Sequence, residues 1–322
     1  MKTVLIVGGA GFIGSHVNKY LHQMGYKTVV FDNLSRGSKK AVVVGDFIEG
    51  DIGSQPDLDS LFQRYSFDAV MHFAAFTNVG ESVKDPKPYY QNNVVNTVTL
   101  LDKMVQYGVK TLIFSSSAAV YGTPDTSFVK ETDATNPINP YGRTKLMVEW
   151  ILKDYAAAYN LRFAALRYFN AAGGDPDGVI KRGNAEQGNL IPLVIKSLIN
   201  NTPLSILGTD YPTPDGTGVR DYIHVMDLAS AHCLAMEALM HGDPSFIVNL
   251  GVGRGCSVLE VIDAVEKVTG RRVQRINAPR RPGDPAILLA DATLAKQQLD
   301  WKVRYPSLEE MIAHAWKSYE MV

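Results

Sequence analysis

A cluster of glycines directly after a short apolar run limits the folds open to this chain more than any other feature of its sequence. The apolar run is Thr3–Val7, and Gly8, Gly11 and Gly14 follow it in the spacing G-x-x-G-x-x-G, with a helical pattern opening at Phe12. Glycine has no Cβ, so the backbone can turn tightly and approach a phosphate closely, and the first N–H groups of a helix attract an anion. Strand, glycines and helix in this order predict the phosphate-binding turn of a dinucleotide-binding fold.

Acidic residues follow the next two predicted strands. Asp32 ends the second strand, where a carboxylate can hydrogen-bond the adenosine ribose hydroxyls and repel a 2′-phosphate. This favours NAD over NADP as the cofactor, although Arg36 lies close by in the sequence and would soften the preference. Asp51 follows the third strand and could bond the adenine, but a simple turn aspartate explains it equally well. The cofactor prediction therefore depends on the glycines and on Asp32.

Short β-branched runs alternate with longer helical patterns through the first half of the chain, which predicts βαβ units and a parallel sheet. The predicted strands are Thr3–Val7, Lys27–Asp32, Val42–Ile48, Ala69–Phe73, Thr111–Ser115 and Phe163–Arg167. The predicted helices between them are Ile13–Met24, Asp57–Tyr65, Val94–Tyr107 and Tyr141–Tyr159. Strands in this order predict an α/β fold with a Rossmann-like, doubly wound parallel sheet.

A glycine-rich segment, residues 173–188, predicts a loop at which a second, smaller region begins. The elements predicted beyond it are the helices Leu190–Ile199, Met226–His241, Val258–Thr269 and Leu308–Tyr319 and the strand Phe246–Leu250. That strand is short and apolar enough to return to the first sheet. We therefore predict an NAD-binding Rossmann domain of residues 1–172 and 221–251, and a mixed α/β substrate-binding domain of residues 173–220 and 252–322.

Composition sets further limits on the class of protein. Hydrophobic residues make up 46% and charged residues 20% of the chain, as in an ordinary globular protein, and the net charge of −1 predicts no attraction to nucleic acid or to an anionic membrane surface. Two cysteines, Cys233 and Cys256, are too few for a disulfide framework or a structural zinc site and indicate a reducing, cytoplasmic location. The histidines form no H-E-x-x-H motif, so we expect no metal site. No segment approaches the ~18 apolar residues of a membrane span, and we expect neither a signal peptide nor a membrane anchor.

A serine, a tyrosine and a lysine are the candidates for catalysis. Ser117 closes a triple serine at the end of the fifth predicted strand, and Tyr141 and Lys145 are i and i+4 on the next helix, which places them on one face. A nearby ammonium and a positive nicotinamide ring would lower the tyrosine pKa from about 10 toward the working range of a base. The phenolate would take a hydroxyl proton while a hydride leaves the same carbon, and Ser117 would hold the reacting oxygen. Each residue alone has an ordinary structural explanation, but their combination with the glycine turn favours catalysis.

These motifs resemble the extended short-chain dehydrogenase/reductase family, and the resemblance runs nearly end to end. The segments that carry it are Gly8–Gly14, Asp32–Leu34, Glu49–Ile52, His72–Ala75, Val79–Val83, Phe114–Gly122, Tyr141–Lys145, Arg167–Asn170, Asp215–Val225 and Pro279–Asp284. The last two segments are far more specific than the glycine turn, because they belong to the substrate half of the nucleotide-sugar epimerases of this family.

The resemblance implies which residues line each site. For NAD they are Gly8, Gly11, Phe12, Ile13, Gly14, Asp32, Asn33, Asp51, Ile52, Phe73, Ala74, Asn92, Tyr141, Lys145 and Phe169. For a UDP-sugar they are Ser117, Tyr141, Asn170, Asn189, Leu190, Arg220, Arg281, Asp284 and Leu288. The residue types suit this ligand, because two guanidiniums form forked, charge-assisted bonds to a diphosphate and Asn or Asp can bond ribose and uracil edges.

The activity that the resemblance implies is reversible inversion at C4 of UDP-glucose and UDP-galactose, through a transient 4-keto sugar and bound NAD, by a homodimer. Leu288 occupies the position that limits space beside the sugar C2 group, so a UDP-N-acetylhexosamine stays open as the substrate, and so does UDP-glucuronate. A 4,6-dehydratase is disfavoured because Ser117 is followed by two alanines instead of an Asp-Glu pair. A non-catalytic NAD(P)-binding sensor is the alternative from another class, and such a protein need not retain Ser117, Tyr141 and Lys145.

Overall fold

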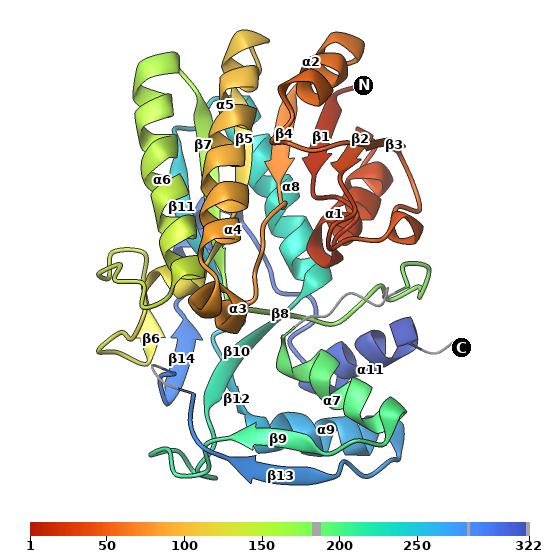
Figure 1. Cartoon of the computed structure of the whole chain (residues 1–322), viewed down its shortest axis with the longest axis vertical. Coiled ribbons are helices and arrows are strands. Elements are labelled where there is room, and N and C mark those ends of the chain that lie inside the picture. The colour runs from red at the N-terminus through yellow and green to blue at the C-terminus, as the bar shows by residue number, and fades with distance from the viewer. Residues whose placement is uncertain (182–187, 282–283, 320–322) are drawn as a thin grey trace.

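The computed structural model describes residues 1–181, 188–281 and 284–319. Its larger part is built on a parallel sheet of seven strands in the order β11-β7-β5-β4-β1-β2-β3 (Figure 1). The strands are β1 (Thr3–Val7), β2 (Lys27–Asp32), β3 (Asp46–Glu49), β4 (Ala69–His72), β5 (Thr111–Ser117), β7 (Arg162–Tyr168) and β11 (Phe246–Leu250). The prediction of a doubly wound α/β sheet is confirmed, and Phe246–Leu250 does return to the first sheet, where it pairs in parallel with β7.

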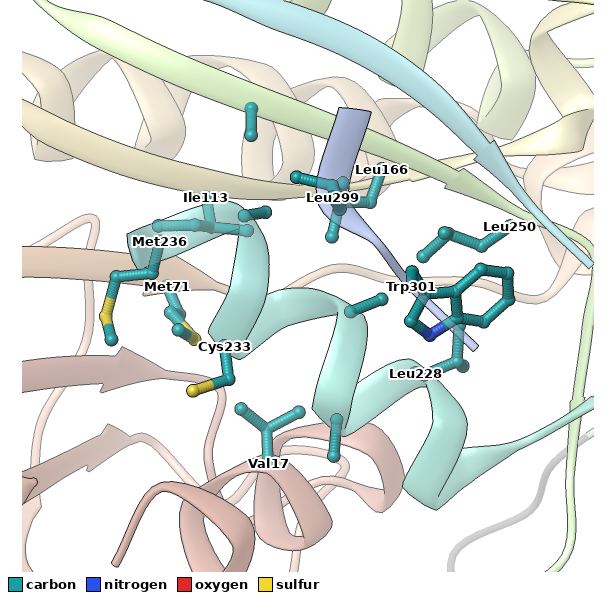
Figure 2. Packing of buried hydrophobic residues seen from close by; sticks show 14 of the residues in the cluster. Val17, Met71, Ile113, Leu166, Leu228, Cys233, Met236, Leu250, Leu299 and Trp301 are labelled. Carbon is teal, nitrogen blue, oxygen red and sulfur yellow. The ribbon is translucent and has the colours of Figure 1, made fainter. Parts of the chain in front are cut away.

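Helices cover both faces of this sheet, because its strands are apolar on both sides. One face packs against α1 (Phe12–Gln23), α8 (Val225–His241) and α10 (Thr293–Leu299), and the other against α2 (Gln55–Arg64), α5 (Asn96–Gln106) and α6 (Pro140–Tyr159). Figure 2 shows the first of these faces, where Leu228, Cys233 and Met236 of α8 pack against the sheet and Trp301 closes one end of the cluster. The sheet is therefore a rigid central layer whose strand ends can place side chains accurately.

A second region lies beyond the carboxyl ends of the parallel strands (Figure 1). Its central strand, β10 (Val219–His224), pairs in parallel with β8 (Asn170–Ala172) and β14 (Ile287–Ala290) and antiparallel with β12 (Gly255–Ser257). Strand β14 also pairs with β6 (Phe128–Val129), while β9 (Leu204–Leu207) and β13 (Arg275–Ala278) form a separate pair. The helices α7 (Leu190–Asn200), α9 (Val258–Thr269) and α11 (Leu308–Tyr319) enclose an apolar cluster of their own. This region is thus assembled from short segments that are far apart in the sequence.

Several short elements complete the fold, and the sequence analysis predicted none of them. They are α3 (Val79–Lys84), α4 (Lys87–Tyr90), the 3₁₀ turns η1 (Lys39–Ala41) and η3 (Ala118–Val120), and the π-helical turn η2 (Gln91–Val95). The turn η2 joins α4 to α5, so the predicted helix Val94–Tyr107 begins instead at Asn96. Single π-helical turns of this kind occur frequently at functional sites.

Two predicted strands have a boundary that is wrong by two residues or more, each for an identifiable reason. The predicted strand Val42–Ile48 is shortened to β3, because Gly45 has φ +79° and a Cβ there would lie 2.3 Å from Oγ1 of Thr28. The predicted strand Thr111–Ser115 continues to Ser117, because β7 supplies partners for the additional residues. The second difference matters for function, since it places Ser117 on the sheet itself.

The predicted loop at residues 173–188 is described only in part, since residues 182–187, Gly183 among them, lie outside the described residues. At its start Gly173 has φ +83°, and a Cβ there would lie 2.5 Å from the buried ring of His224. Lys19 of α1 holds the loop through ion pairs to Asp175 and Asp177 of 2.7 and 2.6 Å. Among the helices of the described ranges, none has the length and apolar composition to cross a bilayer.

Candidate active site

The glycine turn forms a close cradle at the start of α1. Gly8 has φ +78°, and a Cβ on it would lie 2.4 Å from the backbone nitrogen of Ala74, while a Cβ on Gly14 would lie 2.4 Å from the carbonyl oxygen of Gly8. Gly11 precedes α1 and has no side chain to cap it, and the N-terminus of a helix attracts an anion. The turn therefore needs its glycines and presents the donors that a pyrophosphate requires.

The acidic residues lie at the carboxyl ends of β2 and β3. Asp32 is nearly buried and accepts hydrogen bonds from the backbone N–H groups of Ala10 (2.9 Å) and Leu34 (2.8 Å). Burial raises the pKa of the Asp32 carboxyl, and these two bonds oppose that rise. Asn33 donates from Nδ2 to Oδ2 of Asp51 at 2.8 Å, so two residues predicted for the cofactor are in contact.

Arg36, which the sequence placed close to Asp32, is paired with another carboxylate. Its guanidinium pairs with Glu81 at 2.6 Å and lies over the ring of Phe76, 5.1 Å from the ring centre. Both partners lie on the segment that follows β4, and they engage the one cation that the sequence analysis placed beside Asp32. The structure thus pairs the Arg36 charge with Glu81 and not with Asp32.

The remaining residues predicted for the cofactor lie in the segments that leave the sheet at the same edge. Phe73 and Ala74 directly follow β4, and their N–H groups both donate to the carbonyl oxygen of Val7, at 2.8 and 3.2 Å. Ile52 is buried behind Asp51, Asn92 lies in η2, and Phe169 joins β7 to β8. The structure thus brings the predicted cofactor residues to one edge of the sheet.

Ser117, Tyr141 and Lys145 meet where β5 and the start of α6 come together. Asn139 caps α6 by accepting from the N–H of Gly142 at 2.8 Å, and this places Tyr141 in the first helical turn. The Ser117 hydroxyl hydrogen-bonds the Tyr141 phenol. Lys145 donates from Nζ to the carbonyl oxygen of Ser115 at 2.6 Å and lies over the ring of Tyr141, 6.0 Å from its centre.

Burial controls the ionisation of this group. It raises the pKa of Tyr141, against the hydrogen bond from Ser117, and lowers the pKa of Lys145 to about 7, against the negative charge of Glu149. The predicted lowering of the Tyr141 pKa includes the charge of a bound nicotinamide ring and stays a prediction, because in the chain alone removing a phenolate from water raises that pKa. Any lowering must come from added positive charge close to the phenol.

The residues predicted for the substrate lie mainly on the second sheet. Arg220 of β10 pairs with Asp284 at 3.6 Å, and Leu288 of β14 lies opposite Arg220 in the register of the two strands. Asn170 of β8 donates from Nδ2 to the carbonyl oxygen of Asp221 at 2.9 Å. Leu288 and Phe169 pack on an apolar cluster that contains Ala118, Val120, Tyr121, Val129 and Leu146. This cluster connects the second sheet with the turn that follows Ser117.

Three further predicted substrate residues are Asn189, Leu190 and Arg281, and the carbonyl oxygen of Arg281 accepts from the N–H of Asp284 at 3.2 Å. Asn189 precedes α7 and is exposed, Leu190 is half-buried at the first position of α7, and Arg281 is exposed. Within the described ranges no hydrogen bond or ion pair joins Asn189 or Arg281 to Arg220. Pro282 and Gly283, which belong to the same motif as Arg281, lie outside the described residues.

The sequence analysis missed a buried charged pair behind Lys145. Glu149 and Arg167 form a two-pronged ion pair, with Nε to Oε1 at 2.9 Å and Nη2 to Oε2 at 2.5 Å. Glu149 follows Lys145 by one helical turn and lies among the apolar residues of α6. A carboxylate in the apolar face of a helix, in line with Tyr141 and Lys145, was the available signal.

The histidines of this region are held by neighbouring side chains. His72 bonds the hydroxyl of Thr97 at 2.8 Å, and burial lowers its pKa to about 3. His224 bonds His314 at 3.0 Å and stacks on the ring of Tyr305, with ring centres 4.5 Å apart. Among the described residues, no group of three or more His, Cys, Asp or Glu side chains is placed to hold a metal ion.

Comparison with known proteins agrees with this geometry. Residues 4–251 match the model of the NAD dependent epimerase/dehydratase family, and the chain belongs to that family. A UDP-glucose 4-epimerase from Halalkalibacterium halodurans is 48% identical over 97% of this chain and 94% of its own length. The crystal structure of a UDP-glucose 4-epimerase from Brucella ovis in complex with NAD has a TM-score of 0.95 and 48% identity, covering 98% of this chain and 99% of the other. The UDP-Glc/GlcNAc 4-epimerase from Campylobacter jejuni has a TM-score of 0.86 and 40% identity, covering 100% of both chains.

Proposed function

We propose that this chain is an NAD-dependent isomerase that interconverts UDP-glucose and UDP-galactose by inverting C4 of the sugar. The observation that carries the proposal is the contact of Ser117, Tyr141 and Lys145 at the edge of the sheet that also holds the glycine cradle and Asp32. The relatives with that activity match nearly the whole chain. No net oxidation is required, so one bound cofactor can serve every turnover.

The cofactor site fits NAD. The cradle formed by Gly8, Gly11 and Gly14 has no space for a Cβ at two of its positions, and the acid beside it suits unphosphorylated ribose hydroxyls. We assign the cofactor to the lobe of residues 1–172 and 221–251, with Asn33 and Asp51 near the adenosine and Phe73, Ala74, Asn92 and Phe169 along the rest of the molecule. When bound, NAD accepts a hydride from the substrate and later returns it.

Tyr141 acts on the C4 hydroxyl proton. Ser117 holds the reacting oxygen within reach of the phenol, and Lys145 supplies a positive charge that favours the phenolate. Because burial alone raises the Tyr141 pKa, this charge and that of the nicotinamide ring are both needed to bring the phenol into the working range of a base. The same phenol then returns the proton when the 4-keto sugar has presented its other face.

Inversion requires a firm hold on the nucleotide and a loose hold on the sugar. We assign the UDP moiety to the lobe of residues 173–220 and 252–322, with Arg220 and Arg281 on the diphosphate and Asn189, Leu190 and Asp284 around it. Asn170 of β8 contributes to the same site from the end of the first lobe. The Arg220–Asp284 pair keeps the guanidinium oriented before a phosphate arrives. The sugar then lies toward the turn after Ser117, where mainly apolar side chains leave it free to rotate.

Leu288, the residue expected beside the C2 substituent of the sugar, supports a second candidate substrate class. Leu288 packs on the cluster that includes Ala118, Tyr121 and Phe169, so its side chain lies between the second sheet and the turn that follows Ser117, called the catalytic turn below. A leucine is intermediate in size between residues that admit an N-acetyl group and residues that exclude it. The relative from Campylobacter jejuni is named for both sugars. A UDP-N-acetylhexosamine is therefore the second candidate, and UDP-glucuronate stays an alternative that would need a basic or hydroxyl group at the sugar end.

A homodimer through α5 and α6 is also part of this proposal. These two helices lie side by side on one face of the sheet (Figure 1). Large apolar side chains stay exposed on or directly before them, namely Val95, Val105, Trp150 and Tyr159. Replacing Trp150 with Glu should shift the sedimentation coefficient from that of a dimer to that of a monomer. The cytoplasmic location predicted from Cys233 and Cys256 stays a prediction.

The test of the function is a coupled assay of the purified protein with UDP-galactose and, separately, UDP-N-acetylgalactosamine, without added NAD and with it. Turnover of UDP-galactose alone supports the first proposal, and turnover of both supports the second. In that case Leu288→Tyr should remove turnover of the N-acetyl sugar and spare that of UDP-galactose. Failure with both sugars, by folded protein that contains NAD, would contradict the proposal and favour a uronate epimerase or a non-catalytic sensor.

A further inference from the structure

A buried polar network lies directly behind Ser117 and Lys145. The Ser116 hydroxyl donates to Oε1 of Glu149 at 2.6 Å, and Arg167 forms the two-pronged pair with the same carboxylate. Arg167 also donates from Nη1 to the Tyr121 hydroxyl at 2.9 Å, and Tyr121 donates to Oδ1 of Asn249 at 2.7 Å. The network thus joins β5, α6, β7 and β11 through groups that are almost completely removed from water.

The network and the catalytic residues share one strand and one helix. Lys145 reaches the carbonyl oxygen of Ser115, and Glu149, one turn further along α6, accepts from the hydroxyl of Ser116. Two successive residues of β5, Ser115 and Ser116, therefore hydrogen-bond two side chains that lie four positions apart on α6. This arrangement fixes the helix against the strand at the point where Ser117 and Tyr141 must meet.

The negative charge of Glu149 gives the buried network a second role, which concerns the ionisation of Lys145. Lys145 is only 3% exposed, and an ammonium in such a place is unfavourable unless a negative charge is near. The titratable and charged groups on the elements around it include His72 of β4, Glu81 of α3, Tyr121 after η3, Tyr141 and Glu149 of α6, and Arg167 and Tyr168 of β7. Glu81 is engaged by Arg36, and His72 is neutral near pH 7, so Glu149 is the carboxylate in this set that can oppose the burial of Lys145.

We propose that Glu149 is a positioning residue that, held in place by Arg167 and Ser116, keeps Lys145 in its charged form and in register with Tyr141. It touches neither substrate nor cofactor and acts only through Lys145. The inference deepens the function proposed above and depends on it for the kinetic part of its test. Burial alone would favour a neutral amine, and a neutral amine cannot stabilise the Tyr141 phenolate.

The kinetic test is the pH profile of kcat for the NAD-containing enzyme with UDP-galactose. In Glu149→Gln, Lys145 loses the carboxylate and faces an uncompensated Arg167, so the high-pH limb of the profile should move to lower pH by at least about one unit. At the pH optimum of the unmodified chain, kcat should fall at least about tenfold while KM changes less than about twofold. Glu149→Asp keeps the negative charge, so its high-pH limb should return to the pH found for the unmodified chain.

Matched variants separate this role from simple stabilisation. Asp175→Asn removes another buried carboxylate from an ion pair, that with Lys19, and should lower the unfolding temperature without moving the limb. The double variant Glu149→Gln with Arg167→Gln removes both partners of the buried ion pair, so no unpaired Arg167 remains and the protein should fold even where the single variant does not. Its high-pH limb should still lie at lower pH than that of the unmodified chain, because the carboxylate is absent. The shift should be smaller than in the single variant.

A measurement without turnover makes the test independent of the substrate. The tyrosinate absorbance of the NAD-containing protein is followed with pH, and the curve of the matching Tyr141→Phe protein is subtracted. Glu149→Gln should move the Tyr141 transition to higher pH by at least about one unit, because the ammonium is lost first. An unchanged Tyr141 transition, or a Glu149→Gln limb that coincides with that of Asp175→Asn, would overturn the inference. Absence of turnover in the unmodified chain would instead contradict the proposed function, and the absorbance result would still decide this one.

Discussion

The two lobes of this protein place functional side chains in different ways. In the lobe of the parallel sheet, Ser117, Tyr141 and Lys145 come from one strand and the helix that follows it, packed on a continuous apolar core. By contrast, Asn170, Arg220 and Asp284 come from three separate segments on and around the second sheet, whose strands are short. The first arrangement suits groups that react, because it is rigid, and the second suits groups that recognise a ligand from several sides. We therefore expect substitutions in the first lobe to lower kcat and substitutions in the second to raise KM.

The largest effect expected is that of Tyr141→Phe. Loss of the phenol removes the group that moves the C4 proton, so kcat should fall about 10³-fold. NAD content and the dissociation constant of UDP should stay within about twofold, because the ring and its packing remain. Steady-state kinetics and isothermal titration with UDP would measure both. Turnover close to that of the unmodified chain would remove the catalytic role of the first lobe.

The glycine cradle gives the next largest effect. A methyl group at position 8 would meet the backbone of Ala74 in a residue with φ +78°, so Gly8→Ala should weaken NAD binding by about 10²-fold or more. Gly108→Ala is the control, since Gly108 has φ +72° but nothing within 4 Å of the added Cβ. NAD released by denaturation measures retention in both variants. Equal retention would mean that the close approach to Ala74 plays no part in cofactor binding.

A smaller effect is expected from Arg220→Lys in the second lobe. Lysine keeps the charge but loses the planar fork, so KM for UDP-galactose should rise about tenfold while kcat changes less than about twofold. A matched control is Arg272→Lys, because Arg272 is exposed and pairs only with Glu266 at 2.7 Å among the ion pairs of the described residues. A fall in kcat without a change in KM would break the division of roles between the lobes.

The smallest expected effect is a loss of unfolding free energy as the pH falls. Burial lowers the pKa of His224 to about 3, below that of an unfolded histidine, so the unfolded state binds a proton first as the pH falls through about 6.5. The stability due to neutral His224 is therefore complete above that pH and is lost progressively below it. Between pH 6.5 and 5.5 this one group should remove about 1 kcal/mol of unfolding free energy. Denaturant titrations should show that His224→Gln loses less stability over this interval, and equal slopes for the two proteins would contradict the assignment.

Sequence reasoning succeeded where the relevant signal is local. The glycine turn and the spacing of Tyr141 and Lys145 depend on the geometry of single elements, and the structure places these residues as that geometry requires. The alternation of strands and helices predicted the parallel sheet for the same reason, since period and turn residues are written within short windows. The roles of the predicted site residues themselves stay predictions until the variants are measured.

Sequence reasoning failed where the structure of a segment depends on a partner far away in the chain. Strand β10 was recognised only as a motif, because its pairing with β8 and β14 involves residues far from it in the chain. The burial that raises the pKa of Tyr141 in the chain alone was not predicted, because it is a property of the whole packed site. The pair of Glu149 with Arg167 was missed because neither residue reveals the other in the sequence.

The sequence by itself determined the nucleotide-binding architecture, the preference for NAD expected from Asp32 and the set of candidate catalytic residues. Each of these follows from backbone geometry or side-chain chemistry within a few neighbouring residues. Only the tertiary structure decided that Arg36 is engaged by Glu81, that Leu288 reaches the catalytic turn, and that a buried ion pair lies behind Lys145. Those features depend on desolvation and on contacts between distant segments, and both arise only when the chain is packed.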